Sequence, residues 1–169
     1  MDFYDIVYPF SMPDGFPESL GYRRIFAIGK DVKASDGLKG LENGIFIAKE
    51  NSNVMAAIGL RPRAIVFEDM RINKKALEMM EDRGIALCIP LSSITSLYGL
   101  RRSRALYMTA KLLRHSAKIG IDVSIASFAR SREYMCSPIQ IIAIAKALGI
   151  DEEYARRCIS ETNRKVAMG

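Results

Sequence analysis

Residues 85–91 read IALCIPL, a run that is apolar on both alternating sets of positions. A strand with one face in water alternates apolar and polar side chains, so this run predicts a strand that is buried on both faces. Such a strand belongs to a sheet that is covered on both sides, which is typical of parallel sheets in α/β proteins.

Further short apolar runs alternate with helical patterns along the chain. We expect strands at residues 3–8, 24–29, 44–48, 64–68 and 122–126. This alternation is typical of β-α units and of a mainly parallel sheet. A chain of 169 residues is long enough for one domain with a substantial core. We therefore predict a single α/β domain over residues 1–169, a TIM-like (β/α) barrel that is incomplete or distorted because it has too few units for eight.

Capping residues mark the ends of the predicted helices. Asn73 can cap a helix that Gly84 ends. Ser137 precedes a proline and opens a helix that Gly149 ends. The acids at residues 151–153 suit the positive end of the dipole of the last helix.

Positive charge is concentrated in one part of the chain. Residues 84–132 hold eight basic residues and one acid, Asp122, whereas the other 120 residues hold 17 basic and 18 acidic ones. The formal net charge of +6 therefore comes entirely from residues 84–132, which we call the basic segment. Unbalanced Lys and Arg favour a polyanion such as nucleic acid, because each neutralised phosphate releases counterions.

The longest helix, predicted over residues 99–118, has two faces on a helical wheel. Its basic face holds Arg101, Arg104, Lys111, His115 and Lys118. Its apolar face, which we expect to be buried, holds Leu106, Ala110, Leu113 and Ala117. A solvated surface is one interpretation of the basic face. The lack of Glu or Asp partners favours phosphate binding, because ordinary surface helices mix both signs.

Two loops follow neighbouring predicted strands, where parallel α/β folds place ligand contacts. Residues 127–136 read SFARSREYMC, and residues 92–104 read SSITSLYGLRRSR with five hydroxyls and three arginines. Hydroxyls and guanidinium groups contact phosphate and ribose oxygens, so we expect one basic, hydroxyl-rich rim. The predicted RNA-binding residues are Arg101, Arg102, Arg104, Lys111, Arg130 and Arg132. Aromatic residues in the same part of the chain, which either stack on bases or pack in the core, are Tyr98, Tyr107, Phe128 and Tyr134.

Residues for metal or thiol chemistry are sparse. The single histidine, His115, cannot form a multi-histidine metal site. The spacing of Cys88, Cys136 and Cys158 indicates buried thiols in a reducing compartment, so we expect a cytoplasmic protein. No apolar run approaches the length of a membrane span, so no membrane partner is expected.

Two weaker patterns have structural interpretations. Four acids lie at or near the ends of predicted strands: Asp2, Asp5, Glu68 and Asp69. Such acids either terminate strands or form a two-carboxylate site. Gly37 and Gly40 fit a Gly-x-x-Gly loop but lack the flanking elements that such a loop requires, so we interpret them as a turn.

Residues 85–163 resemble ribonuclease P protein component 3, the thirty-kilodalton subunit family of archaea and eukaryotes. The resemblance rests on IALCIPL with its Ser/Tyr/Arg loop and on the strand that ends at Ser127. It also rests on the closing stretch SPIQIIAIAKALGIDEEYARRCISETN, where Ser160 and Asn163 match a Ser-x-x-Asn-like end. The N-terminal half resembles the family loosely.

The resemblance implies a barrel of the polymerase-and-histidinol-phosphatase-like class that has lost its histidine ligands. It implies an RNA-binding, non-catalytic subunit that supports the ribonuclease P RNA in removing the 5′ leader of precursor tRNA. Expected partners are this RNA, precursor tRNA, the ferredoxin-like component 2 and other ribonuclease P proteins. No cofactor is expected on the protein, whereas Mg²⁺ is expected on the RNA. The alternatives are a stand-alone metal-dependent phosphoesterase of the related barrel class and a protein-interaction module.

Overall fold

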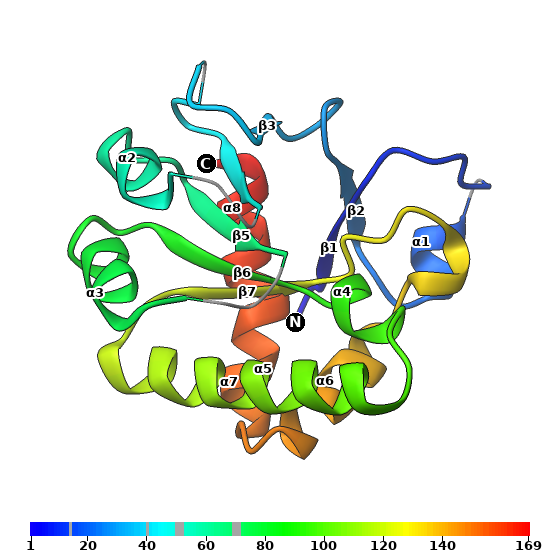
Figure 1. Ribbon diagram of the computed structural model, residues 1–169. Helices are drawn as coiled ribbons and strands as arrows, with labels where there is room; N and C mark the ends of the chain where they lie inside the picture. The colour runs from blue at the N-terminus through cyan, green and yellow to red at the C-terminus, as the bar shows by residue number, and fades with distance from the viewer. Residues whose placement is uncertain (14, 40, 50–52, 69–71) are drawn as a thin grey trace.

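The computed structural model describes residues 1–13, 15–39, 41–49, 53–68 and 72–169 (Figure 1). Its strands are β1 (Tyr4–Val7), β2 (Arg24–Ala27), β3 (Ala34–Ser35), β4 (Ile45–Ala48), β5 (Ala64–Phe67), β6 (Ala86–Pro90) and β7 (Val123–Ala126). Its α-helices are α1 (Phe16–Ser19), α2 (Val54–Gly59), α3 (Lys74–Asp82), α4 (Ser92–Thr95), α5 (Gly99–Ile119), α6 (Pro138–Ala147), α7 (Glu152–Arg157) and α8 (Asn163–Met168). A 3-10 turn (Arg132–Tyr134) precedes α6, and a π-helical turn (Cys158–Thr162) joins α7 to α8.

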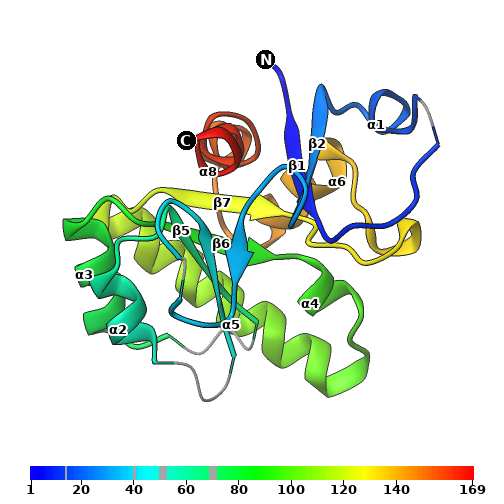
Figure 2. The same cartoon turned by 90° about the horizontal axis from the view of Figure 1, so that it is seen from above.

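The strands form two parallel sheets that curve around a shared interior (Figure 2). One sheet holds β1 and β2, and the other has the order β3-β4-β5-β6-β7. Backbone hydrogen bonds join the chain at β7 to the chain at β1, and we call this junction between the two sheets the seam. Phe128 N–H donates to Ile6 O at 2.8 Å, and Tyr8 N–H donates to Ala129 O at 2.9 Å. The described strands do not close into one continuous ladder, so the prediction of an incomplete or distorted, mainly parallel barrel is confirmed.

The interior of this barrel is filled by apolar side chains from the long strands and from the residues after β7. They include Ile6, Phe26, Ile45, Val66, Cys88 and Phe128, which are at most 2% exposed. Val166 and Ala167 of α8 belong to the same cluster. Arg63, which precedes β5, donates to the carbonyls of both residues at 3.3 Å. Helix α8 therefore covers the amino-terminal ends of the strands.

Strand β6 shows why the IALCIPL run predicts the fold. Ala86 and Cys88 face the barrel interior, whereas Leu87 and Ile89 belong to the outer apolar cluster. That outer cluster includes Leu77 of α3, Leu113 of α5 and Ile141 of α6. Because helices cover the outer face and other strands cover the inner one, every position of β6 is apolar.

The sequence signals for element ends are confirmed. Each of the six expected strands is present, with ends that shift by at most two residues. Asn73 Oδ1 accepts from Ala76 N–H at 2.7 Å at the start of α3, and Ser137 forms a capping box at the start of α6. Gly84 and Gly149 follow α3 and α6 with φ of 64° and 87°, the left-handed conformation that glycine adopts at low cost.

The elements that sequence patterns did not predict are short. Strand β3 has two residues, α1 and α4 have four each, and α2 has six, which are too few residues for a periodic pattern to be recognised. The interpretation of Gly37 and Gly40 as a turn is only partly visible, because Gly40 lies outside the described residues. Within the described part of the chain, no helix combines the length and apolar character that crossing a bilayer demands.

Candidate nucleic-acid interface

Four of the six predicted RNA-binding residues lie on α5. Arg101, Arg102, Arg104 and Lys111 are exposed along this helix. The prediction that residues 92–104 form a loop is wrong, because Ser92–Thr95 is α4 and α5 begins at Gly99. The hydroxyls of Thr95, Ser96 and Ser103 donate to backbone carbonyls one turn earlier, which is compatible with helix. The three arginines are thus spaced by helix geometry rather than by a loop.

The buried face of α5 differs from the face that the wheel predicts. Its buried residues are Thr109, Ala110, Leu112, Leu113 and Ser116. Ala117 is exposed and Leu106 is half-buried, contrary to the prediction. Two polar residues fall on the buried face, and the hydroxyl of Thr109 is accommodated there because it donates to Ala105 O at 2.8 Å.

The expectation that His115 lies on the exposed basic face is also wrong. Its side chain is half-buried, and its Nε2 is enclosed without a hydrogen-bond partner among the described residues. The ring lines a groove of about 340 Å³ between α3 and α5, together with Leu77 and Met108. Packing of α5 against α3 encloses this side of the helix, which a wheel drawn for an isolated helix cannot show.

The cations of the basic segment have no carboxylate partners in the described part of the chain. None of the ion pairs found there includes Arg101, Arg102, Arg104, Arg130 or Arg132. Nor do they include the other cations of the segment, which are Lys111, Arg114 and Lys118. The one acid of the segment, Asp122, pairs with Lys165 from outside it. The positive charge of the segment is therefore available to a ligand.

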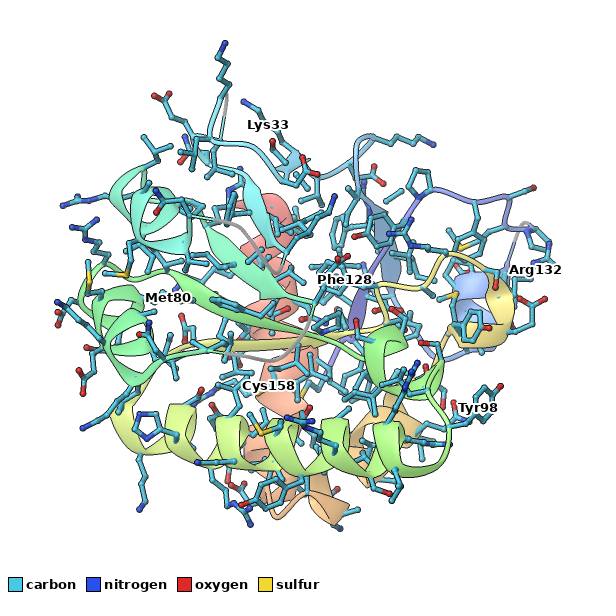
Figure 3. The ribbon with its side chains drawn as sticks, in the orientation of Figure 1. Lys33, Met80, Tyr98, Phe128, Arg132 and Cys158 are labelled. Carbon is cyan, nitrogen blue, oxygen red and sulfur yellow. The ribbon has the colours of Figure 1, made fainter. Side chains whose placement is uncertain are left out.

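Arg130 and Arg132 are exposed in the segment after β7, where they rest on aromatic rings. The Arg130 guanidinium lies 4.1 Å from the centre of the Tyr8 ring, and that of Arg132 lies 5.4 Å from the Phe16 ring. Both rings come from the N-terminal part of the chain. Figure 3 shows Arg132 on the same side of the molecule as Tyr98, which immediately precedes α5.

Hydrogen bonds join the two predicted segments of the rim. Ser92 N–H donates to Ser127 O, and the Ser92 hydroxyl donates to Phe128 O, both at 2.9 Å. The hydroxyls of Thr95, Ser96 and Ser103 each donate to the carbonyl four residues earlier. Of the five predicted hydroxyls, four are therefore engaged as donors within the fold, and Ser93 is the one for which no such bond is found among the described residues.

The four aromatic residues of the basic segment and its border divide into two groups. Tyr98, Tyr107 and Tyr134 are 79%, 64% and 40% exposed, whereas Phe128 is 1% exposed in the barrel interior. Figure 3 shows Phe128 near the centre of the molecule and Tyr98 at its edge. Three tyrosine rings are thus accessible beside the basic residues, and Phe128 is a core residue.

A pocket of about 240 Å³ lies at the carboxyl ends of β5, β6 and β7. Val66, Pro90 and Phe128 contribute its apolar lining. Its polar lining consists of Tyr8, Glu68, Ser92, Ser93, Ser96, Arg130 and Tyr134. The Tyr8 hydroxyl donates to Glu68 Oε1 at 3.4 Å, and burial, followed by Glu68, raises the pKa of Tyr8. Of the six predicted RNA-binding residues, only Arg130 lines this pocket. Ser92, Ser93 and Ser96 of the predicted hydroxyl-rich rim line it as well.

The acids near strand ends do not form a shared site among the described residues. Asp2 is exposed and pairs with Arg23, Glu68 lies in the pocket, and Asp69 lies outside the described residues. Asp5 follows the alternation of β1 and points away from Ile6, out of the barrel interior. In the described ranges no three His, Cys, Asp or Glu side chains are grouped as a metal site requires.

The three cysteines are buried and have no disulfide partner, which confirms the expectation of buried thiols. Burial raises the pKa of Cys88 and of Cys158 to about 12. Both thiols therefore stay protonated near neutral pH, and a protonated thiol is a poor nucleophile.

Two buried polar side chains join β1 to the C-terminal half. Asn163 is fully buried, and its Nδ2 donates to Tyr4 O at 2.8 Å and to Ile125 O at 2.9 Å. Its Oδ1 accepts from the Ser124 hydroxyl at 2.6 Å. Asp5 Oδ1 accepts from Ser127 N–H at 2.7 Å. Asn163 and Asp5 thus hold the seam between β1 and β7.

Burial at this seam changes the acidity of Asp5. Burial raises its pKa to about 6, although hydrogen bonds from Ser127 and Ile6 act to lower it. Asp5 is fully enclosed, and its Oδ2 has no hydrogen-bond partner among the described residues. The carboxylate is therefore a structural group whose charge disfavours the folded state.

The sequence pattern places Ser93 and Tyr134 with the basic segment, but it does not bring Tyr8 or Glu68 to them. At Glu68 it indicates a strand terminator or part of a two-carboxylate site. The common feature of these four residues is that each follows a strand or a turn at the carboxyl side of the barrel. Aligning the residues just after each expected strand would have brought Tyr8, Glu68 and Ser92 together, because parallel strands end at one edge.

Comparisons with known proteins show a likeness of fold. No protein-family model matches the sequence, and no curated protein matches it. One similar solved chain comes from an archaeal ribonuclease P with mature tRNA, with a TM-score of 0.69 and 15% identity over 97% of this chain and 79% of that one. Another is ochratoxinase of A. niger, with a TM-score of 0.54 and 13% identity over 73% of this chain and 30% of that one. The chain shares its α/β architecture with both proteins.

Proposed function

We propose that the chain is an RNA-binding protein subunit of ribonuclease P, equivalent to component 3. The observation that carries the proposal is the likeness of fold, over nearly the whole chain, to a chain of archaeal ribonuclease P with tRNA. The sequence resemblance over residues 85–163 supports the same assignment. In this role the protein supports a catalytic RNA that removes the 5′ leader of precursor tRNA, and it is not itself the catalyst.

The unpaired cations supply the physical basis for this role. RNA phosphates repel one another, and Lys and Arg side chains lower that repulsion while they release bound counterions. The candidates for these contacts are Arg101, Arg102, Arg104, Lys111, Arg130 and Arg132, which are all exposed. Mg²⁺ for the cleavage would be held by the RNA. The proposed protein partners are component 2 and the other ribonuclease P proteins. Buried cysteines without disulfides agree with a cytoplasmic location.

Affinity purification of the tagged protein from its own cells, followed by sequencing of the bound RNA, tests the proposal. We expect ribonuclease P RNA and precursor tRNA to be enriched, and component 2 to be present in the protein fraction. Nuclease treatment should release part of the assembly. A complex that contains protein alone and resists nuclease would contradict the proposal and favour a protein-interaction module.

A further inference from the structure

The pocket at the carboxyl ends of the strands combines an apolar floor with opposite charges on its walls. Val66 and Phe128 form part of the floor, whereas Glu68 and Arg130 line the same space. A surface that only attracted phosphate would not place a carboxylate there, because it would repel the ligand. The occupant must therefore present hydrogen-bond donors to Glu68 and must be flat or apolar enough for the floor.

Arg130 is arranged to present a flat surface. Its guanidinium lies 4.1 Å from the centre of the Tyr8 ring, and the side chain is exposed and lines the pocket. Tyr134 is 40% exposed and lines the same pocket. Proteins bind unpaired RNA bases by stacking them on Tyr rings and on Arg guanidinium planes. These two side chains match that mode of recognition.

The size of the pocket limits what can enter it. Its volume is about 240 Å³. Pockets for drug-sized ligands enclose roughly 300–1,000 Å³. The space therefore suits one planar ring system rather than a whole nucleotide. In RNA, the attached ribose and phosphate would remain outside the pocket.

Glu68 selects among the four bases. A carboxylate only accepts hydrogen bonds, and each of its oxygens has two lone pairs, so Glu68 can accept from Tyr8 and still accept from a ligand. Guanine presents two adjacent donors, N1–H and N2–H, which match the two oxygens of one carboxylate. On the Watson–Crick edges of adenine, cytosine and uracil no two donors are adjacent: each donor lies beside an acceptor, which a carboxylate repels. Ser93 adds a hydroxyl that can donate to a guanine acceptor.

We infer that this pocket binds a single unpaired guanine of the RNA partner, with Glu68 reading its donor edge and Arg130 and Tyr134 stacking against it. The inference rests on the proposed RNA-binding function and adds a base preference to it. The contacts of the basic segment with phosphate carry no sequence information, whereas the pocket contact does.

Binding of short RNAs to the native protein tests the inference. The probes are heptauridylate and two variants whose central base is guanine or adenine, each followed by fluorescence anisotropy. We expect the guanine probe to bind roughly 5- to 100-fold more tightly than the other two, the range for one good bidentate contact. Equal affinities for all three probes would overturn the inference while leaving RNA binding intact. Failure to bind these probes and precursor tRNA alike would overturn the proposed function as well.

Two variants test whether Glu68 causes the preference for guanine. Glu68→Gln places an amide donor against the guanine donors, so the guanine preference should disappear while heptauridylate binding is kept. Glu81→Gln on α3 is the matched control, because Glu81 is exposed and undergoes the same change of charge. It should keep the full preference. An equal loss of affinity for every probe in Glu68→Gln would show a structural role and contradict the inference.

A competition experiment distinguishes binding of a guanine within RNA from binding of a free guanine nucleotide. Guanosine 5′-monophosphate is added to the complex of the native protein with the guanine probe. We expect displacement only at a large excess, because the free nucleotide lacks the neighbouring phosphates that the basic segment would contact. Displacement at concentrations equal to those of the probe would assign the pocket to a free nucleotide and contradict the RNA version.

Discussion

The basic segment and the rest of the chain hold their positive charges in different ways. Elsewhere, several cations have acids beside them, as in Arg23 with Asp2, Arg24 with Asp31 and Lys74 with Glu78. Each exposed pair contributes little to stability, about 0–1 kcal/mol, but it cancels the local field. None of the cations in residues 84–132 has such a partner among the described residues, so the fields of neighbouring cations add. The comparison shows that arrangement, rather than total charge, distinguishes a binding surface.

The two parts of the chain also depend on each other. The N-terminal part supplies the rings of Tyr8 and Phe16 on which Arg130 and Arg132 lie. Asn163 and Asp5 hold β1 against β7 and so fix those rings beside the basic segment. The difference between the two parts of the chain can therefore be tested by changing the seam or by removing the charges.

The largest effect is expected at the seam. Asn163→Ala leaves the carbonyls of Tyr4 and Ile125 without their buried donor, and we expect it to lower the free energy of unfolding by about 3 kcal/mol. Chemical denaturation measures the change. Asn73→Ala is the control, because it removes the exposed cap of α3 and should cost only about 1 kcal/mol. Equal losses in the two variants would show that Asn163 is not a tie across the seam.

The next effect removes charge from α5. The triple change Arg101→Ala, Arg102→Ala and Arg104→Ala should weaken binding of precursor tRNA by about 10- to 100-fold at low salt, because three phosphate contacts are lost. The matched control removes three cations that are paired with acids: Arg23→Ala, Arg24→Ala and Lys74→Ala. Its affinity should change by less than about threefold. Similar losses in both variants would mean that net charge alone governs binding.

The pH dependence of stability tests whether Asp5 titrates as a buried carboxyl group at the seam. The pKa of Asp5 is raised from 3.8 to about 6 in the folded state, so folding binds protons between these values and stability falls as pH rises through them. Asp5→Asn removes this fall while its side-chain oxygen can still accept from Ser127. We expect the stability of the variant relative to the native protein to be about 2 kcal/mol more favourable at pH 7.5 than at pH 4.

Denaturation at the two pH values checks this expectation. Other acids titrate over the same range, so the quantity to compare is the difference between variant and native protein. Asp151→Asn is a matched control, because asparagine also caps helices and α7 should keep its cap. A constant difference between Asp5→Asn and the native protein across the range would show that Asp5 does not titrate at the seam.

The smallest effect concerns one arginine on its ring. Arg130→Ala should weaken RNA binding by roughly threefold and reduce the salt dependence by about one phosphate contact. Arg157 provides the control, because its guanidinium also lies over a ring, 5.1 Å from Tyr154, but outside the basic segment. Arg157→Ala should leave RNA affinity unchanged, as measured by anisotropy. An identical loss in both would remove the distinction between the two regions for single residues.

Local signals in the sequence were sufficient for most of the fold. The strand at residues 85–91 and the caps at Asn73 and Ser137 depend on neighbours in the chain, and the structure confirms them. The environment of His115 and the exposure of Ala117 depend on how α5 packs against other elements, so a helical wheel gave the wrong answer. The same holds for the seam, because Asn163 meets Tyr4 across 159 residues of chain.

The candidate site was predictable in composition but not in shape. The count of Lys and Arg identified the basic segment, because charge balance needs no geometry. The pocket required knowledge of which strand ends meet, and Tyr8, Glu68 and Ser93 come from three separate parts of the sequence. The roles of the six predicted RNA-binding residues stay predictions.

The salt dependence of RNA binding measures how many phosphates the predicted cations neutralise. If the six predicted cations each neutralise a phosphate, the slope of log K against log salt should be about −4 to −5 for the native protein. The triple change at Arg101, Arg102 and Arg104 should reduce the size of that slope by about 2–3. The control variant, in which Arg23, Arg24 and Lys74 are replaced by alanine, should keep the native slope. A slope near zero for the native protein, or a native slope for the triple variant, would contradict phosphate binding by these cations.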